Sequence, residues 1–165
     1  MSVEGAHAHR IGVISDTHGL LRPEAVQALQ GSELIIHAGD LGKAQVLDAL
    51  QAIAPVVAVR GNVDRGVWAQ QLPHSAVIEV GGAGLYVLHI LEQLDLDPVA
   101  GGFQAVIFGH SHQPSLTERA GVLYLNPGSA GPLRFHLPVS LAKLHVQSGQ
   151  VTAEILTLEI PFAFT

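Results

Sequence analysis

The chain has 165 residues, which is enough for one ordinary domain with a sizeable core. Hydrophobic residues make up 48% of the chain and charged residues 13%, a balance that excludes a disordered protein. The formal net charge of −6 argues against a nonspecific binder of nucleic acids or anionic membranes, and the lack of cysteine excludes disulfides and thiolate metal sites.

The first residues lack the apolar segment of a secretory signal. We expect residues 1–9 to be disordered or frayed and residues 10–165 to form a single domain. His7 and His9 could bind a metal ion, but a frayed terminus is the favoured interpretation. No apolar run reaches the ~18 residues of a membrane span, so we expect a cytoplasmic protein that does not associate with membranes.

The first half of the chain alternates short apolar runs with segments of helical spacing. The runs are rich in Val and Ile and are bounded by Gly, Pro or Asp, which indicates buried strands at residues 11–15, 33–37 and 55–59. Between them, Pro23 suits the first position of a helix, and the apolar residues of 43–53 fall on one helical face. This order predicts a βαβαβ unit with parallel, doubly buried strands.

The second half of the chain consists mostly of further apolar runs. They predict strands at residues 76–80, 85–89, 105–109, 122–126, 140–146 and 151–158. Gly81-Gly82 and Ser148-Gly149 separate neighbouring runs and predict the turns of two hairpins. The expected fold class is α/β, with two mixed β-sheets packed face to face and helices outside.

Oxygen and nitrogen donors follow most of these strands. The steps from Asp16 to Asp40, Asn62, His89 and His110 are 24, 22, 27 and 21 residues, about one strand and one crossover each. Because the C-terminal ends of parallel strands converge at one edge of a sheet, seven candidate metal ligands should meet there. They are Asp16, His18, Asp40, Asn62, His89, His110 and His112.

This donor set can hold two divalent ions. Asp16 and His18 can reach one ion, while His110 and His112 could each serve a different ion. The Asp40 carboxylate can bridge. Imidazole and carboxylate ligands suit Mn, Fe, Zn or Ni, and Mn is our expectation. Two divalent ions among these donors leave a positive pocket that attracts an anion, which favours phosphoester hydrolysis.

Five motifs in this order resemble those of the calcineurin-like metallophosphoesterases. The motifs are Asp16-x-His18, Gly39-Asp40, Gly61-Asn62, His89 and Gly109-His110-x-His112. In its compact length and its Asn126-Pro127-Gly128-Ser129 turn, the chain resembles members of the small YfcE/MJ0936-type phosphodiesterase branch. The resemblance covers about residues 10–130. It implies a four-layer αββα sandwich and a binuclear metal centre.

The resemblance also implies a division of the ligands. Asp16, His18, Asp40 and His112 would hold the first ion. Asp40, Asn62, His89 and His110 would hold the second, so that Asp40 bridges the two ions. It implies a hydroxide between the ions as the nucleophile. Asp40, Asn62 and His110 would then serve catalysis, with Asp40 positioning the hydroxide.

The chain departs from the family pattern at two places. Many relatives have a histidine after the Asn of the Gly-Asn motif, where it is thought to act as the general acid, but here Val63 stands there. We therefore expect a phosphodiesterase rather than a phosphomonoesterase, acting on a small phosphoester. His89 is followed by Ile90-Leu91 instead of Gly-His, and the short stretch to His110 predicts a trimmed helix.

Other residues near the motifs have open roles. His37 is expected to orient a ligand, Arg60 could bind phosphate or pair with a carboxylate, and Thr17 has no assigned role. His74, His136 and His145 are interpreted as surface or packing residues, and Asp64 as a helix cap.

Two alternative functions stay open. One is a non-catalytic protein-interaction scaffold of the same fold, with Val67-Trp68 or Pro161-Phe162 as candidate partner surfaces. The other is a metal-dependent nuclease or cyclic-nucleotide phosphodiesterase, although no long nucleic acid is expected as a partner. A homo-oligomer is also possible.

Overall fold

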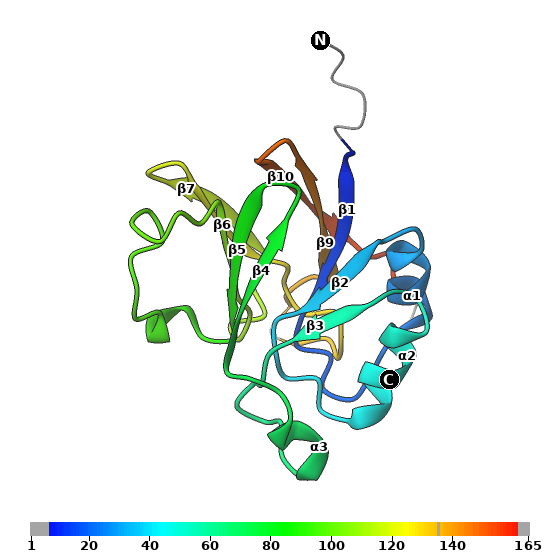
Figure 1. The fold of residues 1–165 in the computed structure, drawn as a ribbon. Coiled ribbons are helices and arrows are strands. Elements are labelled where there is room, and N and C mark those ends of the chain that lie inside the picture. Colours follow the sequence, from blue (N-terminus) through cyan, green and yellow to red (C-terminus); the bar gives the residue numbers. More distant parts are fainter. Residues whose placement is uncertain (1–6, 135, 162–165) are drawn as a thin grey trace.

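The computed structural model describes residues 7–134 and 136–161. Within these ranges the chain forms two five-stranded sheets, and helices cover the outer face of the first sheet (Figure 1). The helices are α1 (Pro23–Leu29), α2 (Ala44–Gln51), the short α3 (Val67–Gln70) and the 3₁₀ helix η1 (Leu91–Gln93). Pro23 begins α1, as its fixed φ angle predicts.

The first sheet has the strand order β10-β9-β1-β2-β3. Its strands are β1 (His9–Ile14), β2 (Leu34–His37), β3 (Val56–Ala58), β9 (Ser140–Gln147) and β10 (Gln150–Thr157). The pairs β1–β2 and β2–β3 are parallel, which confirms the βαβαβ unit. The predicted hairpin of β9 and β10 is antiparallel and lies beside β1.

The second sheet has the order β4-β5-β6-β8-β7. Its strands are β4 (Ser75–Val80), β5 (Ala83–Leu88), β6 (Ala105–Ile107), β7 (Ser115–Arg119) and β8 (Val122–Asn126). The β4–β5 hairpin is confirmed, while β5–β6 and β6–β8 are parallel. Both sheets are therefore mixed, as expected.

The main core lies between the two sheets. Ile11 and Val13 of β1 face this space, whereas Ile14 packs against α1 and α2 on the other face. This alternation follows from the two-residue period of a strand. Each fully buried Ile or Leu contributes about 1.5–3 kcal/mol relative to an exposed one, so both faces of the first sheet hold it in place.

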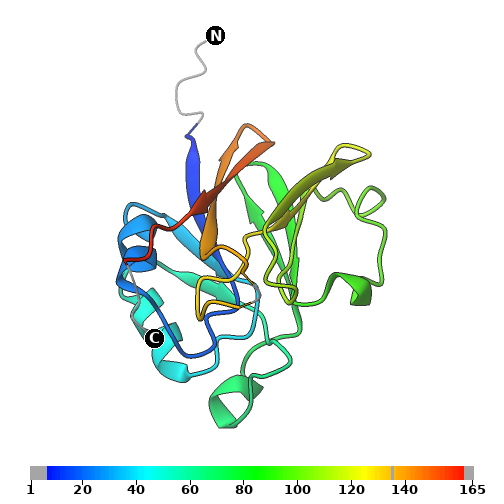
Figure 2. The ribbon, with the colours of Figure 1, turned by 180° about the vertical axis from the view of Figure 1, so that it is seen from behind.

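The outer face of the second sheet has a thinner cover than the first. Residues 89–104 contain only η1 and irregular segments, which pack on Tyr86 and Leu88 through Leu91, Leu94 and Phe103 (Figure 2). The fold is the expected αββα sandwich, with the fourth layer reduced to this segment. The trimmed helix expected between His89 and His110 is confirmed, since η1 has only three residues.

The structure tests the predictions for residues 1–9 and for the domain boundary only in part. Residues 1–6 of the frayed segment lie outside the described residues, while β1 begins at His9. The single-domain boundary stays a prediction. Across the described ranges, no helix is both long enough and apolar enough to cross a membrane.

Candidate metal centre

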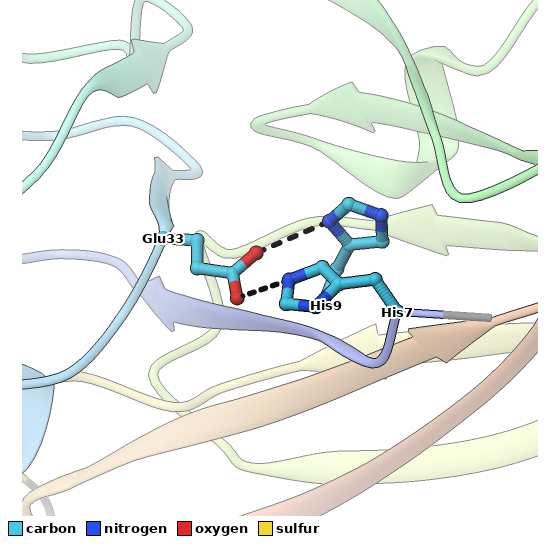
Figure 3. Close-up of side chains that lie close together, drawn as sticks. All are labelled: His7, His9 and Glu33. Atoms are coloured by element: carbon cyan, nitrogen blue, oxygen red, sulfur yellow. Dashed lines mark hydrogen bonds and ion pairs between the residues drawn. The ribbon is translucent and has the colours of Figure 1, made fainter. Parts of the chain in front are cut away.

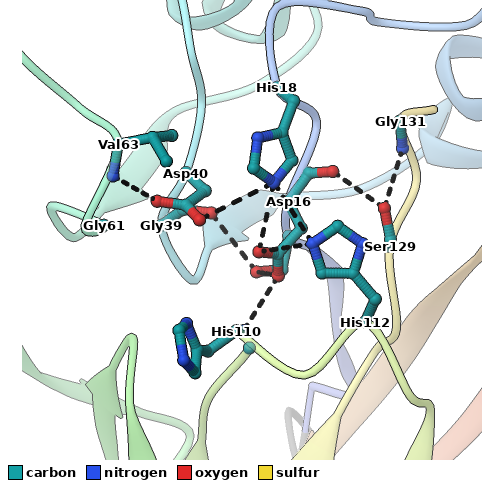
Figure 4. Close-up of polar contacts among 12 residues, drawn as sticks. Asp16, His18, Gly39, Asp40, Gly61, Val63, His110, His112, Ser129 and Gly131 are labelled. Atoms are coloured by element: carbon teal, nitrogen blue, oxygen red, sulfur yellow. Dashed lines mark hydrogen bonds and ion pairs between the residues drawn. The ribbon is translucent and has the colours of Figure 1, made fainter. Parts of the chain in front are cut away.

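All seven candidate ligands lie at one edge of the two sheets. Figure 4 shows five of them, namely Asp16, His18, Asp40, His110 and His112. Asp16, Asp40 and Asn62 follow β1, β2 and β3, while His89 and His110 follow β5 and β6. Each sheet thus contributes loops from the carboxyl ends of its parallel strands, where ligands bind in open α/β sheets.

One set of three donors, which we name the closed group, consists of Asp16, His18 and His112. Their ligand atoms lie within 4.8 Å of one another. Asp16 Oδ1 is 3.4 Å from His112 Nε2 and 3.7 Å from His18 Nε2, separations beyond a good hydrogen bond. Within the described residues this oxygen is buried without a hydrogen-bond partner. Such an atom is costly, and a cation among the three donors would satisfy it.

The remaining donors, which we name the open group, are Asp40, Asn62, His89 and His110. Asn62 Oδ1 lies 2.9 Å from His89 Nε2 and 3.2 Å from His110 Nδ1. Asp40 Oδ2 lies 3.2 Å from His89 Nε2 and 3.6 Å from His18 Nε2, so the carboxylate stands between the two groups. The donors fall into the two sets assigned to two ions from the sequence. Their role as ligands stays a prediction.

The ring of His89 is oriented toward the open group by a backbone contact. Its Nδ1 is 2.7 Å from the carbonyl oxygen of Ala38, which can only accept, so Nδ1 carries the hydrogen. In the neutral ring the Nε2 lone pair then faces two more acceptors, Asn62 Oδ1 and Asp40 Oδ2. Three acceptors around one point fit a divalent cation, and the replacement of Gly-His by Ile90-Leu91 leaves this arrangement intact.

The charges of the site favour ionised carboxylates. Burial raises the pKa of Asp16, but the imidazoles of His112 and His18 outweigh it and hold the pKa well below its usual range. Burial also raises the pKa of Asp40, yet contacts with His89 and the Val63 amide lower it overall. Burial lowers the pKa of His89, but Asp40 and Asp16 raise it overall. A divalent ion would take the place of that His89 proton.

Five candidate ligands have left-handed backbone conformations. They are Asp16 (φ 55°), His18 (φ 47°), Asp40 (φ 60°), His110 (φ 76°) and His112 (φ 64°), five of the eight non-glycine residues with positive φ in the described chain. Strained backbone of this kind collects at functional sites, where the surrounding structure enforces it. Here the loops enforce it together, since the His18 amide donates to the Asp40 carbonyl oxygen at 3.0 Å.

Asp64 holds two of these loops together. Its carboxylate accepts from the amides of Asp40 (3.0 Å), Gly42 (2.9 Å) and Gly61 (2.8 Å), and its side chain is buried. The helix-capping role expected for Asp64 is wrong, because α3 begins after Gly66 and has no side-chain cap. The sequence held no signal for this role, because two of the three amides lie 22 to 24 residues earlier in the chain.

Three further side chains support Asp16 and the loop after β6. Ser15 Oγ donates to Asp16 Oδ2 at 2.7 Å, and Ser129 Oγ donates to the Asp16 carbonyl oxygen at 2.9 Å. Asn126 Nδ2 donates to the Gly109 carbonyl oxygen at 3.1 Å. Sequence reasoning missed Ser15. The turn at 126–129 thus contacts the site loops directly.

Two motif glycines are required by close approach. A Cβ atom on Gly61 would overlap the backbone and carboxylate of Asp40. A Cβ atom on Gly109 would overlap the side chains of Ser15 and Asp16. In both cases the glycine of one loop lets the acidic residue of another loop come near.

His37 and Thr17 form a buried chain of hydrogen bonds behind the site. The Gly39 amide donates to His37 Nδ1 at 3.1 Å, so Nε2 carries the hydrogen and donates to Thr17 Oγ1 at 3.0 Å. Thr17 Oγ1 donates in turn to the Leu41 carbonyl oxygen at 3.0 Å. Burial lowers the pKa of His37 to about 4, so the ring is neutral. Both side chains fix loops, and neither is exposed to contact a phosphate.

A cavity of about 230 Å³ opens beside the open group. Its lining includes Arg60, Asn62, His74, His89 and Gln93. Arg60 Nε donates to the Asp64 carbonyl oxygen at 3.2 Å, which holds the guanidinium near the cavity without pairing it to a carboxylate. His74, interpreted as a surface or packing residue, also lines the cavity.

A larger cavity of about 530 Å³ lies along the β4–β5 turn. Glycines and Phe103 line much of it, and Glu79 is the one charged residue of that lining. Its lining has no group of converging donors, so the smaller cavity is the better candidate for a substrate site.

Comparisons with known proteins agree with this geometry. Residues 10–149 match the model of the calcineurin-like phosphoesterase superfamily domain. A protein named probable metallophosphoesterase, from Methanothermobacter thermautotrophicus, is 36% identical over 92% of this chain and 94% of its own length. A phosphodiesterase of Methanocaldococcus jannaschii is 28% identical over 72% of this chain and 82% of its own length.

Solved structures show the same fold at lower identity. A structure described as a novel archaeal phosphodiesterase has a TM-score of 0.74 and 23% identity, and covers 89% of this chain and 99% of its own. Vacuolar protein sorting 29 from Cryptosporidium parvum has a TM-score of 0.79 and 18% identity, with 92% of each chain covered. At these identities the likeness concerns the fold alone.

Proposed function

The chain belongs to the calcineurin-like phosphoesterase superfamily, and on that premise we propose that it is a binuclear metal-dependent phosphodiesterase. We propose that Asp16, His18 and His112 hold one divalent ion, that Asn62, His89 and His110 hold the other, and that Asp40 contacts both. Manganese is the proposed ion, with Fe, Zn or Ni as alternatives, because the donors are carboxylate, imidazole and amide groups.

The observation that carries the proposal is the convergence of unsatisfied donors. In the part of the chain that the structure describes, Asp16 Oδ1 is buried without a hydrogen-bond partner. His89 Nε2 faces two other acceptors, Asn62 Oδ1 and Asp40 Oδ2. Both arrangements are unfavourable for a protein alone and favourable around cations. When bound, a pair of divalent ions would supply an ionised water as the nucleophile and would offset charge on the phosphate oxygens.

The residues of the chain would position the ester in the cavity beside the open group. Arg60 lines that cavity, and its fork of N–H donors suits phosphate oxygens. At about 230 Å³ the cavity is below the ~300–1,000 Å³ typical for larger ligands, which supports a small phosphoester as substrate.

The preference for diesters rests on Val63. Its backbone N–H donates to Asp40 Oδ1 at 2.9 Å, but its side chain has no proton to give to a leaving group. General-acid catalysis contributes roughly 10²–10⁴-fold, so esters with poor leaving groups would suffer most. We propose that diesters and activated aryl phosphates are cleaved faster than alkyl phosphomonoesters.

A comparison of substrates tests the proposal. The purified chain with Mn²⁺ is assayed on bis-p-nitrophenyl phosphate, p-nitrophenyl phosphate and a sugar phosphate, with an Asp40→Asn variant as the inactive baseline. We expect kcat/KM for the diester to exceed that for the sugar phosphate by about tenfold or more. Faster cleavage of the sugar phosphate would contradict the diesterase proposal.

A non-catalytic scaffold is the second candidate function. The fold likeness to vacuolar protein sorting 29 and the 77% exposure of Val67 support it, while Phe162 lies outside the described residues. The presence of all seven donors weighs against it. Metal-loaded protein that cleaves no phosphoester would favour the scaffold. A nuclease or cyclic-nucleotide activity, a cytoplasmic location and a homo-oligomer stay predictions.

A further inference from the structure

A second cluster of donor side chains lies at the start of β1, far from the candidate metal centre (Figure 3). His7 Nε2 is 2.7 Å from Glu33 Oε1, and His9 Nδ1 is 3.1 Å from Glu33 Oε2. One ligand atom from each residue lies within 4.8 Å of the other two. We propose that His7, His9 and Glu33 form a third metal site, which takes a Zn²⁺, Ni²⁺ or Co²⁺ ion.

The sheet holds two of the three donors in place. His9 pairs with Val146 of β9, and the Glu33 amide donates to the Arg10 carbonyl oxygen at 2.8 Å. Gly81 of the β4–β5 turn packs against the His9 ring, because a Cβ atom there would approach its Cδ2 to 2.9 Å. The backbone of both donors is therefore fixed before any ion arrives, which lowers the entropic cost of binding.

His7 completes the set from the segment before β1. Residues two apart in extended chain point to the same side, and the His7 and His9 rings lie with centroids 4.6 Å apart. Their side chains are 59% and 29% exposed, and that of Glu33 is 33% exposed. An ion can therefore enter from solvent and keep water in its remaining coordination positions.

The chemistry of the donors selects the class of ion. Two imidazoles and one carboxylate with open positions suit divalent transition metals, whereas Ca²⁺ and Mg²⁺ prefer sets of oxygen ligands. The competing explanation is that each imidazole donates one N–H to the carboxylate and no ion binds. Both explanations fit the same distances, and added metal distinguishes them.

The third site is independent of the proposed phosphoesterase centre. The extended strand β1 runs from His9 to Ile14, which at about 3.3 Å per residue is roughly 17 Å, and Asp16 lies beyond its end. Variants at one end of β1 therefore leave the donors at the other end untouched. Failure of the third site would not affect the proposed function.

Metal analysis of the untagged chain tests the proposal. Zn²⁺ binding is measured by calorimetry, and bound zinc by elemental analysis after dialysis, for wild type, His7→Ala and Glu33→Gln. His145→Ala is the matched control, since it removes a histidine of β9 that lies outside the cluster. His7 precedes β1, so its loss cannot disturb the sheet.

We expect wild type and His145→Ala to bind one more Zn²⁺ per chain than the other two variants. Residual binding in those variants should be weaker by about tenfold or more. Phosphodiester cleavage by His7→Ala should equal that of wild type. Equal zinc stoichiometry and affinity in all four proteins would overturn the proposal and leave the cluster as two hydrogen bonds.

Discussion

The closed and open groups differ in their access to solvent. Asp16 and His112 are 0% and 6% exposed, and their group lies beneath the loops. His110 and Asn62 are exposed, and a cavity begins beside them. A buried group can hold an ion but cannot meet a substrate without rearrangement. We therefore expect the closed group to retain one ion and the open group to contact the ester.

The two groups also differ in how their donors are supported. Asp16 Oδ2 accepts from Ser15 Oγ at 2.7 Å and from the His110 amide at 3.0 Å. The Asn62 side chain instead meets the imidazoles of His89 and His110, which are themselves candidate ligands. Asp16 is therefore preorganised without an ion, whereas the position of the Asn62 side chain depends on other candidate ligands. The closed group should therefore bind its ion first.

The largest expected effect comes from removing the charge of the closed group. Asp16→Asn should lose the first ion and lower kcat/KM for bis-p-nitrophenyl phosphate by more than the roughly 10²–10³-fold that one lost transition-state donor costs. His110→Ala in the open group should retain the first ion and lose less activity. Elemental analysis and steady-state kinetics measure both effects. Equal loss of metal in the two variants would remove the distinction between the groups.

A second prediction concerns Asp64, whose carboxylate joins the Asp40 and Gly61 loops of the open group. Asp64→Asn replaces one acceptor with an amide N–H, so at least one of the three backbone donors loses its partner. Hydrogen bonds to charged groups contribute about 1.5–3 kcal/mol each, and the free energy of unfolding should fall by at least that much. Metal affinity should fall roughly 10–100-fold, as for other residues that orient ligands.

Asp48→Asn is the matched control for Asp64, because Asp48 lies exposed on α2. Thermal melts with and without Mn²⁺ separate the loss of stability from the loss of metal. If Asp64→Asn matches Asp48→Asn in both measurements, the three hydrogen bonds do not hold the loops. The two groups would then be positioned by their own backbones.

The sequence predicts the donors of both groups better than it predicts the surroundings of those donors. The parallel strands β1, β2, β3, β5 and β6 follow from apolar runs and turn residues, and the loops at their carboxyl ends bring the seven donors to one edge. The strand β7 was missed because most of its residues are exposed and show no apolar run. The helix α3 was missed because four residues give no helical period.

Burial and support of the donors could not be predicted in the same way. The role of Asp64 depends on two amides of one loop 22 to 24 residues earlier and on the amide of Gly61, three residues before it. The support of Asp16 by Ser129 spans 113 residues of sequence. These contacts exist only after the loops meet in space, so strand patterns alone give the donors but not their surroundings.

The smallest expected effect concerns Val63, at the edge of the open group. Its backbone N–H serves Asp40 whatever the side chain is, and the residue is 39% exposed, which leaves room for an imidazole. Val63→His should raise kcat/KM for a sugar phosphate by about tenfold or more, because general acids contribute roughly 10²–10⁴-fold. Cleavage of bis-p-nitrophenyl phosphate should change little, since p-nitrophenolate leaves without a proton.

Val63→Gln is the control, because it adds polarity without an acid. An equal gain in Val63→Gln would show that polarity matters, and no gain in Val63→His would show that the open group limits monoesters for another reason.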